Sequence, residues 1–169
     1  SHLPVEEHHW TISSSPAAPG ALCSTIKESG DFTATIGQTK PGDTALVDGP
    51  FGRFSYVLHP EERDLVFIAG GIGITPLMSM LRHIRDTRAE RTVTLLYANS
   101  SESDIVFRDE LAAMERDGVA GLKVTHVLSK PSDKWKGERG HLDEETIKRL
   151  LGPDAARRSF YLCAPHAHL

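Results

Sequence analysis

The chain has 169 residues, of which 39% are hydrophobic and 25% charged, a composition typical of a folded globular protein. Its formal net charge is −4 and its lysines and arginines are scattered, which argues against a nucleic-acid partner. Glycines and a proline interrupt the most apolar run, residues 65–81, so this run does not suit a membrane span. Cys23 and Cys163 match neither a disulfide framework nor a metal-ligand spacing, which favours a reducing compartment.

The two halves of the chain differ in pattern, and we place the domain boundary between residues 60 and 61. In the first half, short β-like stretches alternate with turns, and the residues from Gly30 onward favour a short helix. Strands are expected at residues 9–13, 22–27 and 44–47. This pattern predicts a separate β domain over residues 1–60.

From residue 61 onward, strands and helices alternate. The expected strands cover residues 65–69, 92–97, 122–128 and 160–163, and the expected helices cover residues 76–84, 107–117 and 143–151. Thr75 is positioned to cap the first of these helices, with Pro76 at its first helical position, and Asp143 is positioned to cap the last. The alternation predicts an α/β domain over residues 61–169, with a parallel sheet covered by helices on both faces.

A glycine-rich loop, residues 70–76 (GGIGITP), joins the first strand of the expected α/β domain to its first helix. Glycine lets backbone N–H groups approach an anion closely, and the following helix N-terminus supplies unpaired N–H groups and a partial positive charge. The loop follows a GxGxxP pattern rather than GxGxxG. It therefore predicts nucleotide binding, with a turn that serves packing alone as the alternative.

Six segments, in order along the chain, together resemble the ferredoxin–NADP reductase superfamily, and within it the branch of ferric reductases and NADPH oxidases. They are residues 8–16 (HHWTISSSP), 30–33 (GDFT), 48–52 (DGPFG), 68–76 (IAGGIGITP), 135–141 (WKGERGH) and 160–165 (FYLCAP). The resemblance implies an antiparallel flavin-binding β-barrel followed by an NAD(P)-binding domain. Few residues precede the first segment, and the family continues past the last one. We therefore expect a partial barrel and an incomplete C-terminal end of the NAD(P)-binding domain.

The first two segments imply residues that hold FAD. Trp10 would stack on the flavin ring, Thr11 would lie near flavin N5, and His8 would contact the ribityl or phosphate part; Ser13 belongs to the same motif. The flavin pyrophosphate would lie at the start of the short helix, at Gly30, Asp31, Phe32 and Thr33. Asp31 would cap that helix and point away from the phosphate. The alternatives are a core tryptophan at 10, an exposed threonine at 11 and a surface histidine at 8.

The later segments imply residues that bind NAD(P)H. The glycine loop would contribute Gly70, Gly71, Gly73, Ile74, Thr75 and Pro76. Within it, the Thr75 hydroxyl would lie near the nicotinamide. Asn99 and Ser100 follow the second strand, in the region that meets the adenosine ribose. Cys163 would lie near the reacting nicotinamide C4 and flavin N5, next to Ala164 where the family has glycine; a buried core cysteine is the alternative.

These residues predict an oxidoreductase that moves a hydride from NAD(P)H to FAD, with Thr11 and Cys163 as its catalytic residues. Electrons would pass on to a haem domain or to iron. The resemblance also implies attachment to a membrane domain absent from this chain, on the cytoplasmic side of a membrane. No metal site is predicted, because the histidines at 8, 9, 166 and 168 lack a ligand spacing. The alternatives are a non-catalytic nucleotide-binding or docking module, and a fragment that binds NAD(P) without flavin.

The stretch of residues 99–104 bears on the choice of nucleotide. It contains two acidic residues, Glu102 and Asp104, and no basic one. Binding sites usually meet the 2′-phosphate of NADPH with Arg or Lys. We therefore expect NADH to be used at least as well as NADPH, unless Arg108 or Lys130 supplies the missing charge.

Overall fold

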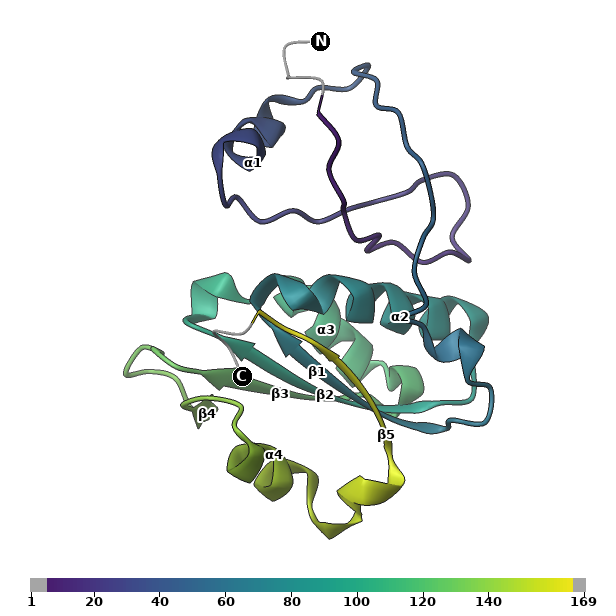
Figure 1. Cartoon of the computed structure of the whole chain (residues 1–169). Helices are drawn as coiled ribbons and strands as arrows, with labels where there is room; N and C mark the ends of the chain where they lie inside the picture. The colour runs from purple at the N-terminus through teal and green to yellow at the C-terminus, as the bar shows by residue number, and fades with distance from the viewer. Residues whose placement is uncertain (1–5, 166–169) are drawn as a thin grey trace.

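The computed structural model describes residues 6–165, and its centre is a five-stranded sheet (Figure 1). The strands are β1 (Asp64–Gly70), β2 (Thr92–Asn99), β3 (Lys123–Leu128), β4 (Glu138–Arg139) and β5 (Ser159–Cys163). Their order across the sheet is β4-β3-β2-β1-β5, and every pairing is parallel. This confirms the predicted α/β fold. The sequence predictions that involve His166 and His168 lie outside the described residues.

Helices cover both faces of the sheet, as predicted. Helices α2 (Ile74–Thr87) and α3 (Arg108–Arg116) pack on one face, and α4 (Glu144–Leu151) packs on the other (Figure 1). The inner strand β1 is buried on both faces, and its residues 65–69 are at most 2% exposed. A strand in this position forms a continuous apolar run, because both of its faces meet helices. None of the described helices combines the length and the apolar character that crossing a membrane requires.

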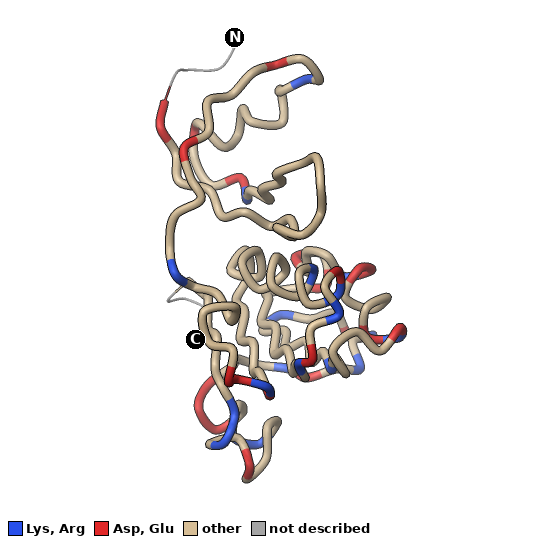
Figure 2. The backbone as a smooth tube through the Cα atoms, turned by 90° about the vertical axis from the view of Figure 1, so that its right-hand side faces the viewer, with Lys and Arg blue, Asp and Glu red and all other residues tan. Residues whose placement is uncertain are grey.

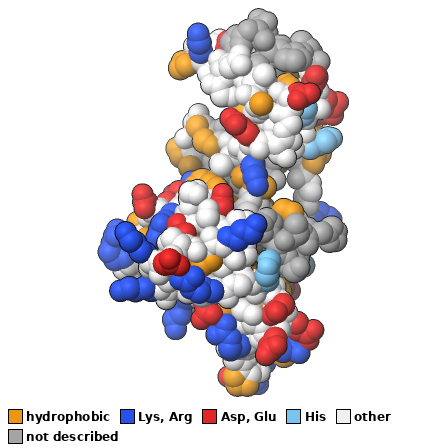
Figure 3. Space-filling view, turned by 90° about the vertical axis from the view of Figure 1, so that its left-hand side faces the viewer, with side chains coloured by type: hydrophobic (Ala, Val, Ile, Leu, Met, Phe, Trp, Pro, Cys, Tyr) orange, Lys and Arg blue, Asp and Glu red, His pale blue; other side chains and the backbone are white. Residues whose placement is uncertain are grey.

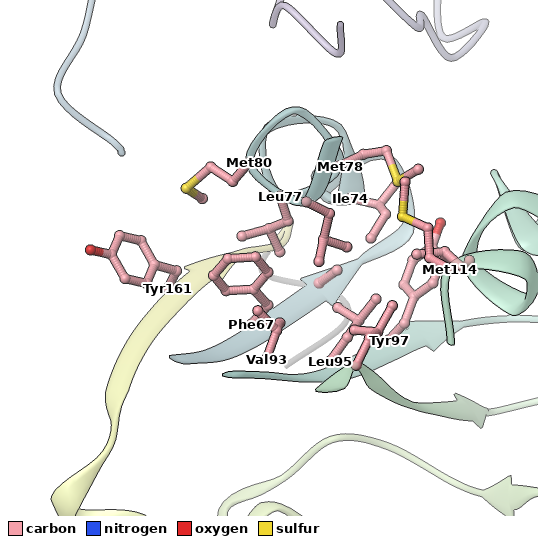
Figure 4. Packing of buried hydrophobic residues seen from close by; sticks show 14 of the residues in the cluster. Phe67, Ile74, Leu77, Met78, Met80, Val93, Leu95, Tyr97, Met114 and Tyr161 are labelled. Atoms are coloured by element: carbon pink, nitrogen blue, oxygen red, sulfur yellow. The ribbon is translucent and has the colours of Figure 1, made fainter. Parts of the chain in front are cut away.

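The larger core cluster lies between the sheet and α2 (Figure 4). Phe67 of β1 and Tyr161 of β5 meet edge to face there, with ring centroids 5.7 Å apart, and Leu77 of α2 is fully buried. The neighbours of Phe67 in sequence, Val66 and Ile68, belong instead to the second cluster, under α4. Successive side chains of a strand point to opposite faces, so one apolar strand supplies both cores.

Residues 6–63 form a loop-rich segment, which we call the N-terminal segment. Most of it lies on the far side of α2 from the sheet (Figure 1), while Tyr56 near its end is buried in the core cluster. It contains the helix α1 (Asp31–Thr35) and an isolated antiparallel bridge between Ile12 and Ser24. The strands predicted at residues 9–13, 22–27 and 44–47 are wrong apart from this bridge. A strand forms only where a neighbouring strand satisfies its backbone N–H and C=O groups, and here the pairing stops after one bridge.

The N-terminal segment leaves several large apolar side chains exposed. Leu46, Val47 and Phe51 have exposed fractions of 105%, 72% and 80%. Figure 2 shows that most of the charged residues of the chain lie on the α/β part. The antiparallel barrel expected here is represented by the single bridge, and the domain boundary at residue 60 stays a prediction.

Helix α2 begins two residues earlier than predicted. Gly73 already has helical backbone angles, φ −60° and ψ −8°, and a 3-10 helix over Gly71–Gly73 runs directly into α2. Thr75 therefore does not cap the helix: its hydroxyl donates to the Ile72 carbonyl oxygen at 3.0 Å. Pro76 is consequently the third helical residue and not the first.

The other two predicted helix caps have different outcomes. Asp143 caps α4 as expected, since its carboxylate accepts the Thr146 N–H at 2.8 Å. Asp31 does not cap α1: the N-cap is Gly30, which makes no side-chain hydrogen bond. Gly30 has a φ of 139°, a conformation that residues with a side chain rarely adopt.

Gly73 lies against the backbone at the end of β5. A Cβ atom there would lie 2.6 Å from the Cys163 carbonyl carbon, 3.2 Å from the Ala164 Cα, and closer still to the Cys163 carbonyl oxygen. Since the backbone angles at Gly73 suit any residue, the requirement for glycine at this position is purely steric.

We expect Gly73→Ala to lower the free energy of unfolding by about 3 kcal/mol, the upper end for an overpacked site, because the clash is with backbone that cannot rotate away. Urea unfolding with linear extrapolation measures the loss. Gly37→Ala is the matched control, since a Cβ at Gly37 meets no atom within 4 Å. Equal losses in the two variants would show that the Cys163 contact is not the cause.

Candidate functional site

The carboxyl ends of three adjacent strands bring together most of the residues predicted to bind a nucleotide. β1 ends at Gly70, β2 at Asn99 and β5 at Cys163. The strand register places Gly70 beside Ala98, and Ala69 beside Cys163. The chain order reverses at β1, which has β2 on one side and β5 on the other. Open α/β sheets bind ligands outside the carboxyl ends of their strands at such a reversal.

The glycine loop is held in place by Tyr97 of β2. The Tyr97 hydroxyl donates to the Gly71 carbonyl oxygen at 3.0 Å. Tyr97 is fully buried, and this burial raises its pKa to about 12, so the hydroxyl stays protonated and keeps donating. Sequence reasoning missed this residue. Its signal is a phenol within the apolar run of residues 95–98, where a buried hydroxyl needs a partner.

Two loop residues predicted to meet a cofactor turn their side chains inward. Ile74 is completely buried in the core cluster under α2. Thr75 is 4% exposed, and its hydroxyl is occupied by the Ile72 carbonyl. A ligand at this end of α2 would therefore meet the loop mainly through its backbone, where Gly71 is partly exposed.

Asn99 is buried at the end of β2 with an unsatisfied side chain. Its exposed fraction is 2%, and within the described residues neither its Oδ1 nor its Nδ2 has a hydrogen-bond partner. The amide lies close enough to the Tyr97 hydroxyl to offset part of the pKa rise that burial causes there, but no well-aligned hydrogen bond joins the two groups. A buried amide without a partner costs about 1–3 kcal/mol. Asn99 therefore offers an unfilled polar position beside the glycine loop.

The loops that follow β2 and β3 are tied to each other by their backbones. The Asn99 carbonyl accepts the Ser129 N–H at 3.1 Å, and the Ser100 carbonyl accepts the Lys130 N–H at 2.8 Å. These bonds bring the Lys130 backbone next to Ser100, the position predicted to meet the adenosine ribose.

Cys163 lies half-buried where β5 ends, and both cysteines of the chain are free thiols. Burial raises the pKa of the Cys163 thiol above its ordinary value of 9.0. The thiol form therefore predominates at neutral pH, and Cys163 does not have the lowered pKa of an activated nucleophile. Cys163 lies at the carboxyl end of a parallel strand, next to Ala164, as the sequence predicts.

The flavin residues predicted in the N-terminal segment form a separate cluster. The His8 ring stacks on Phe32 with centroids 3.8 Å apart, and on Trp10 with centroids 5.3 Å apart. Trp10 keeps 39% of its surface exposed, which is compatible with stacking against a further planar ring. Thr11 beside it is also exposed.

Two hydroxyls predicted to bind the flavin are used inside the N-terminal segment. Ser13 is 1% exposed, and its hydroxyl contacts the Cys23 carbonyl at 3.3 Å and the Thr25 hydroxyl at 3.1 Å. Thr33 accepts the Ser29 N–H at 2.7 Å and donates to the Gly30 carbonyl at 3.1 Å. Both hydroxyls stabilise local structure: the bridge region in one case and the start of α1 in the other.

An open cleft of about 590 Å³ lies at the edge of β3, between residues 124–126 and residues 135–139. The Trp135 indole donates to the Glu138 carbonyl at 3.0 Å and its ring covers Gly137. The same ring meets His126 of β3 with centroids 6.5 Å apart, so Trp135 joins its loop to the sheet. Figure 3 shows the side of the molecule that carries β4, where lysine and arginine side chains gather over the α/β part.

The Cys163 thiol should react slowly with iodoacetamide at neutral pH, because the thiolate is the reactive form and burial disfavours it. The rate should keep rising as the pH passes 9.0, since the pKa lies above that value. Peptide mass spectrometry can follow both cysteines in one sample, with the exposed Cys23 as the internal control. A rate for Cys163 that levels off below pH 9.0, or exceeds that of Cys23 at pH 7, would contradict this assignment.

A family model described as oxidoreductase NAD-binding domain matches residues 67–167. Among curated proteins, the chain is 33% identical over 154 residues to NADH-cytochrome b5 reductase 2 of Mus musculus, which covers 82% of this chain and 56% of that protein. It is 32% identical over 164 residues to the glycine betaine monooxygenase reductase subunit of Pseudomonas aeruginosa, which covers 95% of this chain and 44% of that subunit. The chain thus spans about half the length of the curated relatives it matches.

Solved structures show the same fold. The CS-b5R domains of human Ncb5or, in their NAD+ form, match with a TM-score of 0.69 at 30% identity, over 85% of this chain and 44% of that one. A ferredoxin NADP+ reductase from Neisseria gonorrhoeae with bound FAD and NADP matches with a TM-score of 0.74 at 23% identity. That second match covers 94% of this chain and 67% of the other, and it concerns the fold alone.

Proposed function

Because the chain belongs to the oxidoreductase NAD-binding domain family, within the ferredoxin–NADP reductase superfamily, we propose that it forms the nicotinamide-nucleotide-binding part of a flavoprotein oxidoreductase. In the complete protein, NAD(P)H would give a hydride to FAD, and the electrons would pass on to an acceptor. The observation that carries the proposal is the convergence of the glycine loop, Asn99 and Cys163 at one edge of the sheet.

The residues at this edge fit a dinucleotide. The glycine loop leads into α2, a helix of 14 residues, and the N-terminus of such a helix favours the negative charge of a pyrophosphate. The amide of Asn99 is a polar group for which residues 6–165 supply no hydrogen-bond partner. Half-buried Cys163 lies across the loop from Asn99 in strand order, next to β1. Its neutral thiol suits contact with an uncharged ring better than nucleophilic attack.

FAD is proposed on the resemblance of the N-terminal segment and on the relatives. The exposed part of Trp10 and the exposed Thr11 are the groups that remain available to a flavin. Trp10 would stack on the ring system and Thr11 would donate a hydrogen bond near N5. The hydroxyls of Ser13 and Thr33 would bind FAD only if they gave up their hydrogen bonds within the N-terminal segment.

For the acceptor, the curated cytochrome b5 reductase relatives favour a haem protein. The resemblance of residues 8–16 to ferric reductases favours iron, an attached membrane domain and a position on the cytoplasmic side of a membrane. We propose a haem acceptor first and the membrane attachment second. Fractionation of cells that express the complete protein tests the attachment: recovery of the protein in the soluble fraction after high-speed centrifugation would refute it.

The proposed function is tested by titrating the chain with NADH and NADPH and then adding FAD and ferricyanide. Nucleotide binding followed by FAD-dependent reduction of ferricyanide supports the oxidoreductase. Nucleotide binding in a complete protein that neither holds FAD nor reduces ferricyanide supports a regulatory or docking module. Failure of both nucleotides to bind the complete protein would refute the proposal altogether.

The acidic groups after β2 are fixed close to the proposed ribose position. The Glu102 carboxylate accepts the Ser132 hydroxyl at 2.5 Å, and the Asp104 carboxylate accepts the Ser101 N–H at 2.9 Å. These hydrogen bonds hold two negative charges near Ser100, where a 2′-phosphate would add about two more. Repulsion between them acts within about 8 Å at physiological salt.

We therefore expect NADH to have a kcat/KM at least equal to that of NADPH in the complete protein. Ser100→Arg should move the ratio of the two kcat/KM values toward NADPH, because it adds a charge that can pair with the phosphate. A native preference for NADPH above about tenfold would contradict the assignment. Lys130, held beside Ser100 by its backbone, would then be the first residue to substitute.

A further inference from the structure

The guanidinium of Arg82, in α2, joins three parts of the chain. Its Nε and Nη2 donate to the two carboxylate oxygens of Glu110 in α3, at 2.9 and 2.6 Å. Its Nη1 donates to the carbonyl oxygen of Ser13 in the N-terminal segment at 2.6 Å. The same guanidinium lies over the Phe107 ring, 4.8 Å from the centroid.

These contacts are directional and largely shielded from water. The Arg82 side chain is 17% exposed and that of Glu110 is 32% exposed. The hydrogen bonds from Arg82 lower the pKa of the Glu110 carboxyl against the opposing effect of burial, so the pair stays ionised at neutral pH. A two-pronged arginine–carboxylate contact fixes the plane of the guanidinium. Because two guanidinium nitrogens bind Glu110, the direction in which the third nitrogen can donate is fixed. The Ser13 carbonyl oxygen lies in that direction.

A second contact from the same helix face supports this link. The Ser79 hydroxyl donates to the Ser14 carbonyl oxygen at 2.7 Å. Ser79 and Arg82 are three residues apart, so their side chains lie on one face of α2. Two consecutive carbonyls of the N-terminal segment are therefore bound by one helix. That helix begins at Ile74, directly after the glycine loop.

We propose that Arg82 is a positioning residue that sets the N-terminal segment, with Trp10 and Thr11, at a defined place relative to the glycine loop. The inference rests on the proposed function, in which Trp10 and Thr11 face the flavin and the loop holds the nicotinamide nucleotide. Ser13 is only two residues from Thr11, so displacement of its carbonyl would shift Thr11 as well. Hydride transfer needs the reacting atoms within about 3–3.5 Å, and a displacement of about 1 Å slows it by up to about a hundredfold.

The link itself can be measured in this chain by amide hydrogen exchange. Arg82→Lys keeps the charge but cannot bind Glu110 with two nitrogens and Ser13 with a third. We expect the amides of residues 13–24, including the Ser13 N–H that donates to the Cys23 carbonyl at 2.8 Å, to exchange about tenfold faster. Glu110→Gln, which preserves the shape of the partner, should act in the same direction.

Arg85→Lys is the matched control. Arg85 lies one turn further along α2 and also contacts Glu110, at 3.4 Å, but its other contact is Asp86 rather than the N-terminal segment. Exchange over residues 13–24 should stay within about twofold of the native rate in this variant. Unchanged exchange in Arg82→Lys, or equal acceleration in both variants, would overturn the positioning role.

The consequence for catalysis is measured in the complete protein with its flavin by stopped-flow reduction with NADH. In Arg82→Lys, the rate of flavin reduction should fall at least about tenfold while the NADH dissociation constant stays the same. A matching loss of NADH affinity would show that Arg82 supports the nucleotide site instead and would overturn the proposal. If no variant and no native protein binds NADH, the proposed function fails, and hydrogen exchange alone decides whether Arg82 positions the segment.

Discussion

The candidate site depends on one close backbone contact, between Gly73 and the end of β5 at Cys163, where no side chain fits. This contact places the Cys163 strand end directly beside the loop that opens α2. The Tyr97 hydroxyl binds the same loop from β2, on the other side of β1. The two strands that flank β1 therefore fix the loop from both sides. A loop held in this way loses little conformational entropy when it binds a ligand.

The sheet was predictable because each inner strand shows a strand-type pattern of side chains along its length, such as the apolar residues 65–69 of β1. The two-residue strand β4 was not, since Glu138 and Arg139 have no apolar periodicity and pair only because the loop passes β3. The start of α2 was misplaced because helical backbone angles at Gly73 leave no mark on the sequence. In the N-terminal segment, β-like composition predicted strands that found no partner.

Within the candidate site, sequence placed the glycine loop, Asn99 and Cys163 correctly at one sheet edge, because chain order and strand direction determine which ends meet. Sequence could not show that the hydroxyls of Ser13 and Thr75 bond their own chain. It also missed Tyr97 and Arg82, whose partners lie 26 and 69 residues away in sequence. Contacts at such separations come from the packing of the whole fold, which no local pattern describes.

The uncovered apolar side chains of the N-terminal segment have a practical consequence. Leu46, Val47 and Phe51 lie within six residues of one another and present their surfaces to solvent. Water disfavours such contiguous apolar surface, and proteins that expose it tend to associate with one another or with amphiphiles. We therefore expect the chain, when concentrated, to self-associate through residues 46–51, which are distant in sequence from the glycine loop and Cys163.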